Sequence, residues 1–191
     1  MATLLWTQRQ DIGPSARFGH ALAYDAGNKR TLLVGGDGLA VLFRDSWLWN
    51  GETWTQVEDI GPSGRTGHAI AYESARSRVV LFGGFSSPGQ LADTWEWDGE
   101  AWTQVEDTGP RARARHALAY DSTRSRVVLF GGESAGDPLG DTWEWDGDEW
   151  TQVADTGPSP RSGHAMCFEA SAQRTVLFGG SHLGLERDGL D

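Results

Sequence analysis

The stretch Arg78-Val79-Val80-Leu81-Phe82-Gly83-Gly84 decides the fold, because the same seven letters return at residues 126–132. The glycine pair recurs at intervals of 48 residues, as Gly35-Gly36, Gly83-Gly84, Gly131-Gly132 and Gly179-Gly180. A strict period of this length predicts an array of equal supersecondary units. The apolar run suits a strand that is buried on both faces and breaks at glycines, where the backbone needs unusual angles.

Within each unit, the order of turn and strand signals predicts a four-stranded antiparallel meander. In the second unit a Gly-Pro turn at 61–62 precedes a short strand at 67–72, and a polar turn leads into the glycine-ended strand. A segment that differs between units follows at 85–92. Residues 93–97 then alternate polar and aromatic side chains, and a last strand starts at Trp102.

The turn signal Asp98-Gly99 joins the last two strands and leaves two pairings open. A two-residue turn places Trp95 opposite Trp102, whereas a four-residue loop places Trp97 there. Either way the three tryptophans share one face, because directly opposed residues of an antiparallel pair point the same way. A face this aromatic must be buried, and the neighbouring unit is the available partner.

Composition narrows the classes of protein. The chain has 191 residues, a single cysteine and a formal net charge of −11. We expect one domain over residues 1–191, because repeat units share a continuous core. The acidic balance argues against nucleic acid and anionic membranes as partners. The sequence contains neither an apolar run of the roughly 18 residues that a membrane helix needs nor an export signal, so the cytoplasm is the default expectation.

With these features the units resemble the kelch repeat, which is similar to the blades of the galactose-oxidase propeller. The resemblance extends from Trp6 to Gly180 and rests on the glycine pairs, on the tryptophan after each variable segment, and on an upstream aromatic residue, namely Tyr24, Tyr72, Tyr120 and Phe168. It implies an all-β propeller of four-stranded blades, about four blades in this chain. The last unit is incomplete, because Asp191 stands where Trp143 stands one period earlier.

The resemblance also implies a non-catalytic scaffold for binding or assembly. We expect the variable segments after each glycine pair to carry specificity, because loops on a rigid framework usually do, and Phe85 opens one of them. The alternative is a fragment of a larger propeller enzyme whose active site lies in blades absent here. Copper chemistry of the galactose-oxidase kind would need a cysteine cross-linked to a tyrosine, whereas the tyrosines here hold the repeat position. No cofactor and no catalytic residue is predicted.

Arginines provide the candidate binding residues. One arginine per unit recurs three residues before a histidine, at Arg17, Arg65, Arg113 and Arg161. These side chains either form a positive ring that binds a small anionic ligand or pair with Asp45, Asp93 and Asp141 and with backbone carbonyls. We favour the structural alternative, because a charged side chain at the same position of every unit is most simply explained by a role in building the blade. Arg111 and Arg115 complete a basic cluster around Arg113, the best place for a negatively charged ligand or protein.

The repeated histidines raise the question of a metal site. His20, His68, His116 and His164 occupy one repeat position. Zinc would need their nitrogens within about 2.1 Å of one point, whereas packed sheets lie about 10 Å apart. We therefore predict packed, hydrogen-bonded structural histidines and no metal. His182, near Glu186 and Asp188, lies outside the repeat and is only a weak metal candidate.

The two ends of the array suggest self-association. Residues 4–8, which include Trp6, have the sequence of an outermost strand, and the unit at 161–180 lacks that strand. Two copies could therefore close a ring of about eight blades. A monomer and a truncated fragment remain open alternatives.

Overall fold

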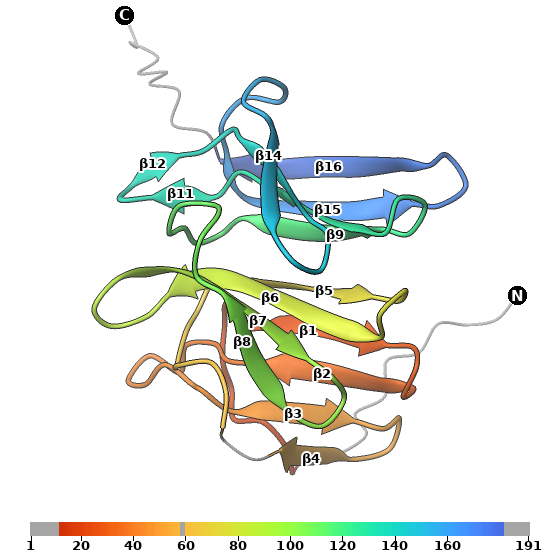
Figure 1. Cartoon of the computed structure of the whole chain (residues 1–191). Coiled ribbons are helices and arrows are strands. Elements are labelled where there is room, and N and C mark those ends of the chain that lie inside the picture. Colours follow the sequence, from red (N-terminus) through yellow and green to blue (C-terminus); the bar gives the residue numbers. More distant parts are fainter. Residues whose placement is uncertain (1–11, 58–59, 182–191) are drawn as a thin grey trace, which may run out of the picture.

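The protein is all-β, as the repeat units predict. A computed structural model describes residues 12–57 and 60–181, which form three four-stranded antiparallel sheets along the chain (Figure 1). The first sheet consists of β1 (Ala21–Asp25), β2 (Arg30–Val34), β3 (Ser46–Trp49) and β4 (Trp54–Val57). The second consists of β5 (Ala69–Glu73), β6 (Arg78–Phe85), β7 (Gln90–Trp97) and β8 (Trp102–Glu106). The third consists of β9 (Ala117–Asp121), β10 (Arg126–Phe130), β13 (Thr142–Trp145) and β14 (Trp150–Ala154).

Two shorter ribbons accompany these three blades. β11 (Glu133–Ser134) pairs with β12 (Asp137–Pro138) between β10 and β13. β15 (Ser162–Glu169) pairs with β16 (Arg174–Ser181), and these two strands begin the last blade. Within the described ranges, no helix is long and apolar enough to cross a membrane.

The outer hairpin of each blade has a four-residue loop, so the two-residue alternative is wrong. Trp97 pairs with Trp102, and their ring centroids lie 5.6 Å apart. The Asp98 N–H donates to the Ala101 carbonyl at 3.2 Å. The Asp98 carboxylate also accepts bonds from the Glu100 and Ala101 N–H groups, at 2.9 and 2.8 Å. The Asp98 carboxylate therefore stabilises a four-residue loop, which is wider than the two-residue turn that an Asp-Gly pair indicates.

The glycine pairs mark the places where the next blade docks. Gly83 and Gly84 have φ values of 59° and 103°, a region that side chains with a Cβ rarely adopt. A Cβ at Gly83 would lie 2.8 Å from the Arg113 carbonyl oxygen, and one at Gly84 would lie 2.9 Å from the His68 Cβ. The Gly84 N–H donates to the Arg113 carbonyl at 2.9 Å. Strand β6 continues through this pair to Phe85 with a register shift, so the expected break is a bulge.

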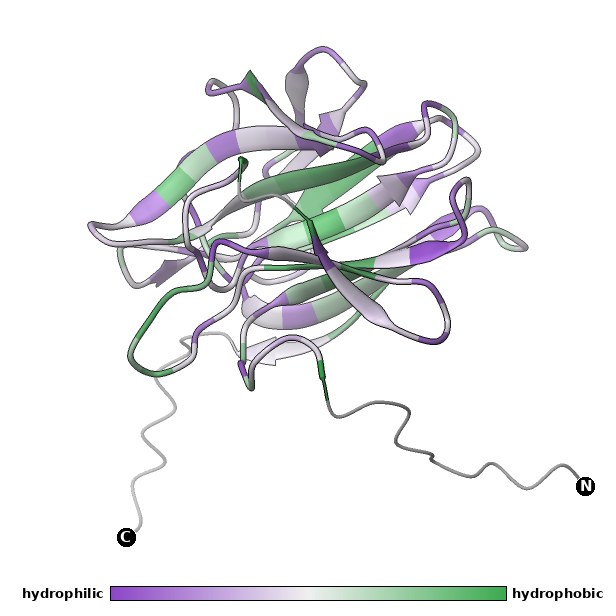
Figure 2. Ribbon diagram, turned by 90° about the horizontal axis from the view of Figure 1, so that it is seen from below, coloured by the Kyte–Doolittle hydropathy of each residue, from purple (hydrophilic) through white to green (hydrophobic). Residues whose placement is uncertain are grey.

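The tryptophan face of each blade packs against the preceding blade, as expected. Leu81 and Trp97 of the second blade form one core with Leu32 of the first blade. Trp145 of the third blade forms the next core with Phe82 of the second, and both side chains are almost fully buried. Figure 2 shows the hydrophobic residues, coloured green, gathered on the strands in the middle of the protein. The core is therefore a series of similar layers between blades.

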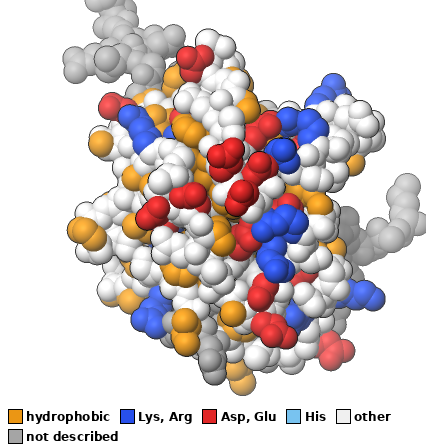
Figure 3. All heavy atoms as spheres, in the orientation of Figure 1, with side chains coloured by type: hydrophobic (Ala, Val, Ile, Leu, Met, Phe, Trp, Pro, Cys, Tyr) orange, Lys and Arg blue, Asp and Glu red, His pale blue; other side chains and the backbone are white. Residues whose placement is uncertain are grey.

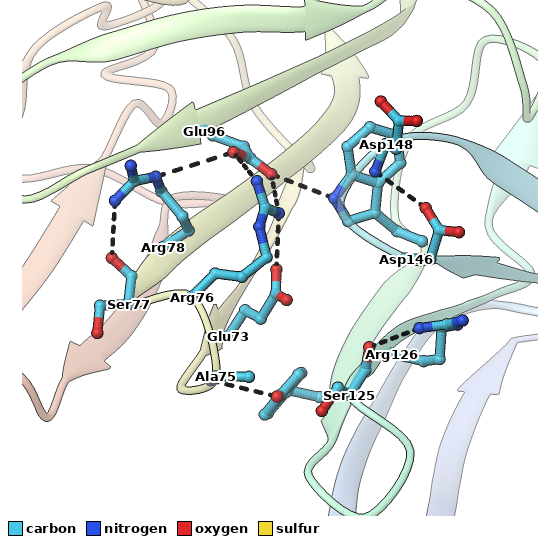
Figure 4. Close-up of polar contacts among 12 residues, drawn as sticks. Glu73, Ala75, Arg76, Ser77, Arg78, Glu96, Ser125, Arg126, Asp146 and Asp148 are labelled. Carbon is cyan, nitrogen blue, oxygen red and sulfur yellow. Dashed lines mark hydrogen bonds and ion pairs between the residues drawn. The ribbon is translucent and has the colours of Figure 1, made fainter.

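A charged network around Glu96 of β7 also joins the second and third blades (Figure 4). The Arg76 guanidinium donates to both Glu96 carboxylate oxygens at 2.6 and 2.8 Å and to Glu73 at 3.1 Å. One of these Glu96 oxygens also accepts the indole N–H of Trp145 at 3.2 Å. The Glu96 carboxylate is thus held in place for an indole of the next blade.

Candidate binding face

The segments that follow the glycine pairs lie on one side of the blades, at the left of Figure 1. They are residues 37–44, the turn between β6 and β7, and the β11–β12 ribbon, and we call this side the loop face. The variable segment at 85–92 is shorter than its sequence predicts. Strand β6 includes Phe85 and β7 begins at Gln90, so only residues 86–89 form the turn.

A hollow of about 420 Å³ opens on this face among the first three blades. Phe18 and Phe85 provide its aromatic surface, and Gln90, Arg115 and Glu133 provide polar groups. The aromatic side chains are 54% and 45% exposed, and the Arg115 side chain is 65% exposed beside Glu133 at 3.4 Å. The hollow thus combines accessible apolar surface with an ion pair, a combination typical of sites that orient a ligand.

Backbone hydrogen bonds between segments position the residues that line the first hollow. Thr66 and Phe85 exchange two N–H···O bonds of 2.9 and 2.8 Å, and Ala114 and Glu133 repeat this arrangement one blade later. The Gln90 side chain then crosses between blades. Its amide nitrogen donates to the Glu133 carbonyl at 3.1 Å, and its oxygen accepts the Ala135 N–H at 2.7 Å. The lining side chains therefore stand on a hydrogen-bonded framework.

A second hollow, also of about 420 Å³, lies beside the first. Leu39, Val41 and Phe85 are among the residues that line it, so Phe85 belongs to both hollows. Leu39 is 89% exposed and Val41 is 53% exposed. Apolar side chains gathered in this way on a surface indicate a binding site for another molecule.

Three of the repeated arginines lie inside the blades instead of around a channel. Arg65 donates to both Asp93 carboxylate oxygens at 2.7 Å and to the carbonyls of Gly83 at 2.9 Å and Ser63 at 3.0 Å. Its side chain is 1% exposed, and the Arg113 side chain, paired with Asp141, is 0% exposed. Arg17 forms the same pair with Asp45. This geometry matches the structural alternative and gives these arginines no surface toward a ligand.

The ion pairs set the charge state of the partner aspartates. Burial alone would raise the pKa of Asp93, but the hydrogen bonds and charge of Arg65 outweigh burial and hold this pKa below its usual value. The indole N–H of Trp95 adds a bond of 2.7 Å to the same carboxylate. Each aspartate therefore joins the segment that precedes β1, β5 or β9 to a tryptophan of its own blade.

The remaining predicted binding arginines, Arg111, Arg115 and Arg161, do not form one cluster. Arg161 is half-buried, and it donates to the carbonyls of Ser159 and Gly179 through hydrogen bonds at the surface. Arg111 is exposed at a turn, and Arg115 points to the first hollow, where it pairs with Glu133. The predicted basic cluster is divided because Arg113, between them, is buried. Of the predicted binding residues, Phe85 and Arg115 line these two hollows.

The histidines are packed between blades, but hydrogen bonding does not hold them. No hydrogen-bond partner lies at either ring nitrogen of His68, His116 or His164 among the described residues. Instead His116 packs edge-on against Phe82 of the preceding blade, with ring centroids 5.5 Å apart. Burial, reinforced by Arg65 and Arg113, lowers the pKa of His68 and of His116 to about 3. The expected hydrogen bonds are therefore wrong, because these rings fill space as neutral groups against the glycine pairs.

Histidine, cysteine and acidic side chains do not gather into a metal-binding group of three within residues 12–57 and 60–181. The weak candidate at His182, Glu186 and Asp188 lies outside these residues, as does the strand expected at 4–8.

The sequence indicated the variable segments that contain Gln90 and Glu133 but not these two residues individually, and it did not indicate Phe18. Gln90 and Glu133 lie in segments that differ from unit to unit, so the period carries no signal for them. Phe18 follows the repeated arginine, where the other units have Thr66, Ala114 and Ser162. This departure from the repeat could have indicated Phe18 as a binding residue, because a large apolar side chain replaces small ones at that position.

Comparison with known proteins agrees with the repeat architecture. A family model described as the KLHDC2/KLHL20/DRC7 Kelch-repeats domain matches residues 1–180. No match was found among the curated proteins.

Proposed function

Because the chain belongs to the Kelch-repeat family, whose members are typically protein-interaction scaffolds, we propose that it binds a protein partner through the loop face and catalyses no reaction. The observation that carries this proposal is the group of exposed apolar side chains around the two hollows, namely Phe18, Leu39, Val41 and Phe85. Phe85 lies between the hollows and is the proposed anchor. Exposed aromatic residues beside a hollow are common anchors of protein interfaces.

The charges of the loop face favour a peptide segment over a small anionic ligand. Arg115 is the basic side chain of the first hollow, and the acidic residues Asp37 and Glu133 line the same hollow. Glu133 lies 3.4 Å from the Arg115 guanidinium and partly neutralises it. In Figure 3 the acidic side chains gather near the middle of the blades, beside basic ones, whereas hydrophobic side chains are visible at the left, where the loop face lies. A partner with an apolar side chain and mixed polar groups fits this surface best.

Selection from a displayed library of random peptides tests this proposal. We expect enriched peptides to bind the wild-type protein and to lose about tenfold or more in affinity with the variant Phe85→Ser, because an anchor residue typically contributes this much. Val153→Ser is the matched control, since Val153 is 48% exposed on β14 and lines neither hollow. Peptides that bind both variants as well as the wild type, or no enrichment at all, would contradict the proposal.

A second candidate function is assembly with another copy of the chain. Phe178 of β16 is 84% exposed, and Tyr24 of β1 is 57% exposed. These residues lie on blade faces of the kind that are buried between neighbouring blades elsewhere in the protein. Assembly would complete the propeller in the manner that the incomplete last unit suggests.

A further inference from the structure

We propose that the exposed face of the β15–β16 hairpin binds the exposed face of the first blade of a second copy, in the register that the internal blades use. This inference rests on the self-assembly proposed above and names its interface. The last-blade face consists of Ala165, Cys167, Val176 and Phe178. The first-blade face consists of Leu22, Tyr24, Trp47 and Trp49.

The last-blade face has the composition of an interior surface but is exposed. Val176 is 41% exposed and Phe178 is 84% exposed. One period earlier, Val128 and Phe130 occupy the same positions and are only 6% and 3% exposed. A following blade covers the positions in the third blade, whereas none covers them in the last blade among the described residues. Cys167 shows the same contrast, since it is exposed where its counterpart Ala119 is buried.

The first-blade face shows the complementary contrast. Leu22 is 53% exposed, whereas its counterpart Leu118 is 8% exposed. The counterparts of Tyr24 accept hydrogen bonds from the preceding blade, because the Tyr72 hydroxyl receives the Gly27 N–H at 3.0 Å and the Tyr120 hydroxyl receives the Ala75 N–H at 3.3 Å. The repeat register places the Ser171 N–H of a second copy at the corresponding distance from Tyr24.

The glycine pairs complete the match between the two faces. A Cβ at Gly35 or Gly131 would lie within 3.1 Å of a histidine Cε1 of the next blade, at His68 and His164 respectively. The equivalent position of the last blade is Gly179, and no atom lies within 4 Å of a Cβ built there. His20 of the first blade is exposed. The register thus places His20 of one copy into the space at Gly179 of the other.

These contrasts favour a second copy over an unrelated protein as the occupant. An unrelated partner would need its own indole and histidine groups at matching positions, whereas this chain presents both complementary faces. A contact between the last blade of one copy and the first blade of another is head-to-tail, and such contacts give a ring when the rotation closes. Two copies would give about eight blades, within the known range for propellers.

Light scattering and sedimentation over about 1 to 100 μM should show a concentration-dependent dimer. We expect Phe178→Asp and Leu22→Asp each to weaken this dimer about tenfold or more, because each places a charge in an apolar interface. Val153→Asp is the matched control and should dimerise like the wild type, because Val153 is exposed on β14, outside both faces. All three positions are exposed, and circular dichroism checks that each variant folds.

A mixture of the two interface variants tests the head-to-tail arrangement. Phe178→Asp keeps an intact first-blade face and Leu22→Asp keeps an intact last-blade face, so the mixture should regain one interface and associate more strongly than either variant alone. A dimer formed by two copies of the same face would not regain this association, and that outcome would overturn the proposal.

Cys167 provides a readout that needs no substitution, because it is the single cysteine and lies on the last-blade face. Its alkylation rate should fall as the wild-type concentration rises and stay constant for Phe178→Asp. A wild-type chain that is monomeric throughout would contradict self-assembly and this interface together. A dimer that persists in both interface variants would refute the interface and leave self-assembly standing.

Discussion

Breaking the buried ion pair of the second blade should destabilise the protein strongly. The variant Arg65→Met keeps most of the side-chain volume but removes every hydrogen bond that the guanidinium makes to Asp93, Ser63 and the Gly83 carbonyl. Asp93, whose side chain is 18% exposed, is left as a charge largely without compensation. Breaking such a pair typically costs about 3 to 5 kcal/mol. Because Asp93 is partly solvated, we expect about 3 kcal/mol.

Arg161 provides a matched control for this experiment within the same chain. It occupies the same repeat position but is only half-buried, its hydrogen bonds lie at the surface, and it has no carboxylate partner within the described ranges. Its bonds run to Ser159 and the Gly179 carbonyl. Exposed polar contacts contribute about 1 kcal/mol or less, so Arg161→Met should change stability by no more than this.

Denaturant unfolding followed by tryptophan fluorescence measures both variants. A loss of about 3 kcal/mol corresponds to a fall of roughly 6 to 12 °C in Tm for a chain of this size. Adding Asp93→Asn to Arg65→Met should restore part of the stability, because the isolated buried charge is then removed. Equal losses for Arg65→Met and Arg161→Met, or an Arg65→Met variant within 1 kcal/mol of the wild type, would refute the reasoning.

Three further predictions concern acid, the glycine pair and the loop face. Burial holds the pKa of His68 and of His116 near 3 in the folded state, so between about pH 6.5 and 3 these side chains are protonated in the unfolded chain but not in the folded one. The free energy of unfolding should therefore fall by about 1.6 kcal/mol per histidine between pH 6.5 and pH 5, and His116→Gln should remove the contribution of one histidine. Gly83→Val should lower the free energy of unfolding in denaturant by several kcal/mol, because it combines a φ of 59° with a Cβ that would lie 2.8 Å from a carbonyl oxygen. The control Gly89→Ala should be nearly neutral, because no atom lies within 4 Å of a Cβ built there. Similar stability of the two variants would contradict the docking role of the glycine pair. Exchanging residues 86–89 for a neutral linker should leave the Tm unchanged. Gln90→Ala should lower the Tm by a few degrees, because the Gln90 side chain links two blades. A large fall in Tm for the linker variant would show that the turn belongs to the core.

The sequence by itself determined the blade and its stacking. A period of 48 residues, an apolar strand ending in two glycines, and three tryptophans of one parity sufficed to predict the antiparallel meander and the burial of its aromatic face. These features are local or repeat regularly, so each unit contains the information that builds it. The same regularity also produced the family resemblance that the family model confirms.

Only the tertiary structure decided which residues are available to a ligand. Arg113 and Arg115 are two residues apart, yet one is buried against Asp141 and the other lines a hollow. The hollow itself depends on Phe18, Phe85 and Glu133, which belong to three different blades. Their proximity is set by how far each blade turns relative to the last. That rotation results from packing between whole sheets, and no single repeat encodes it.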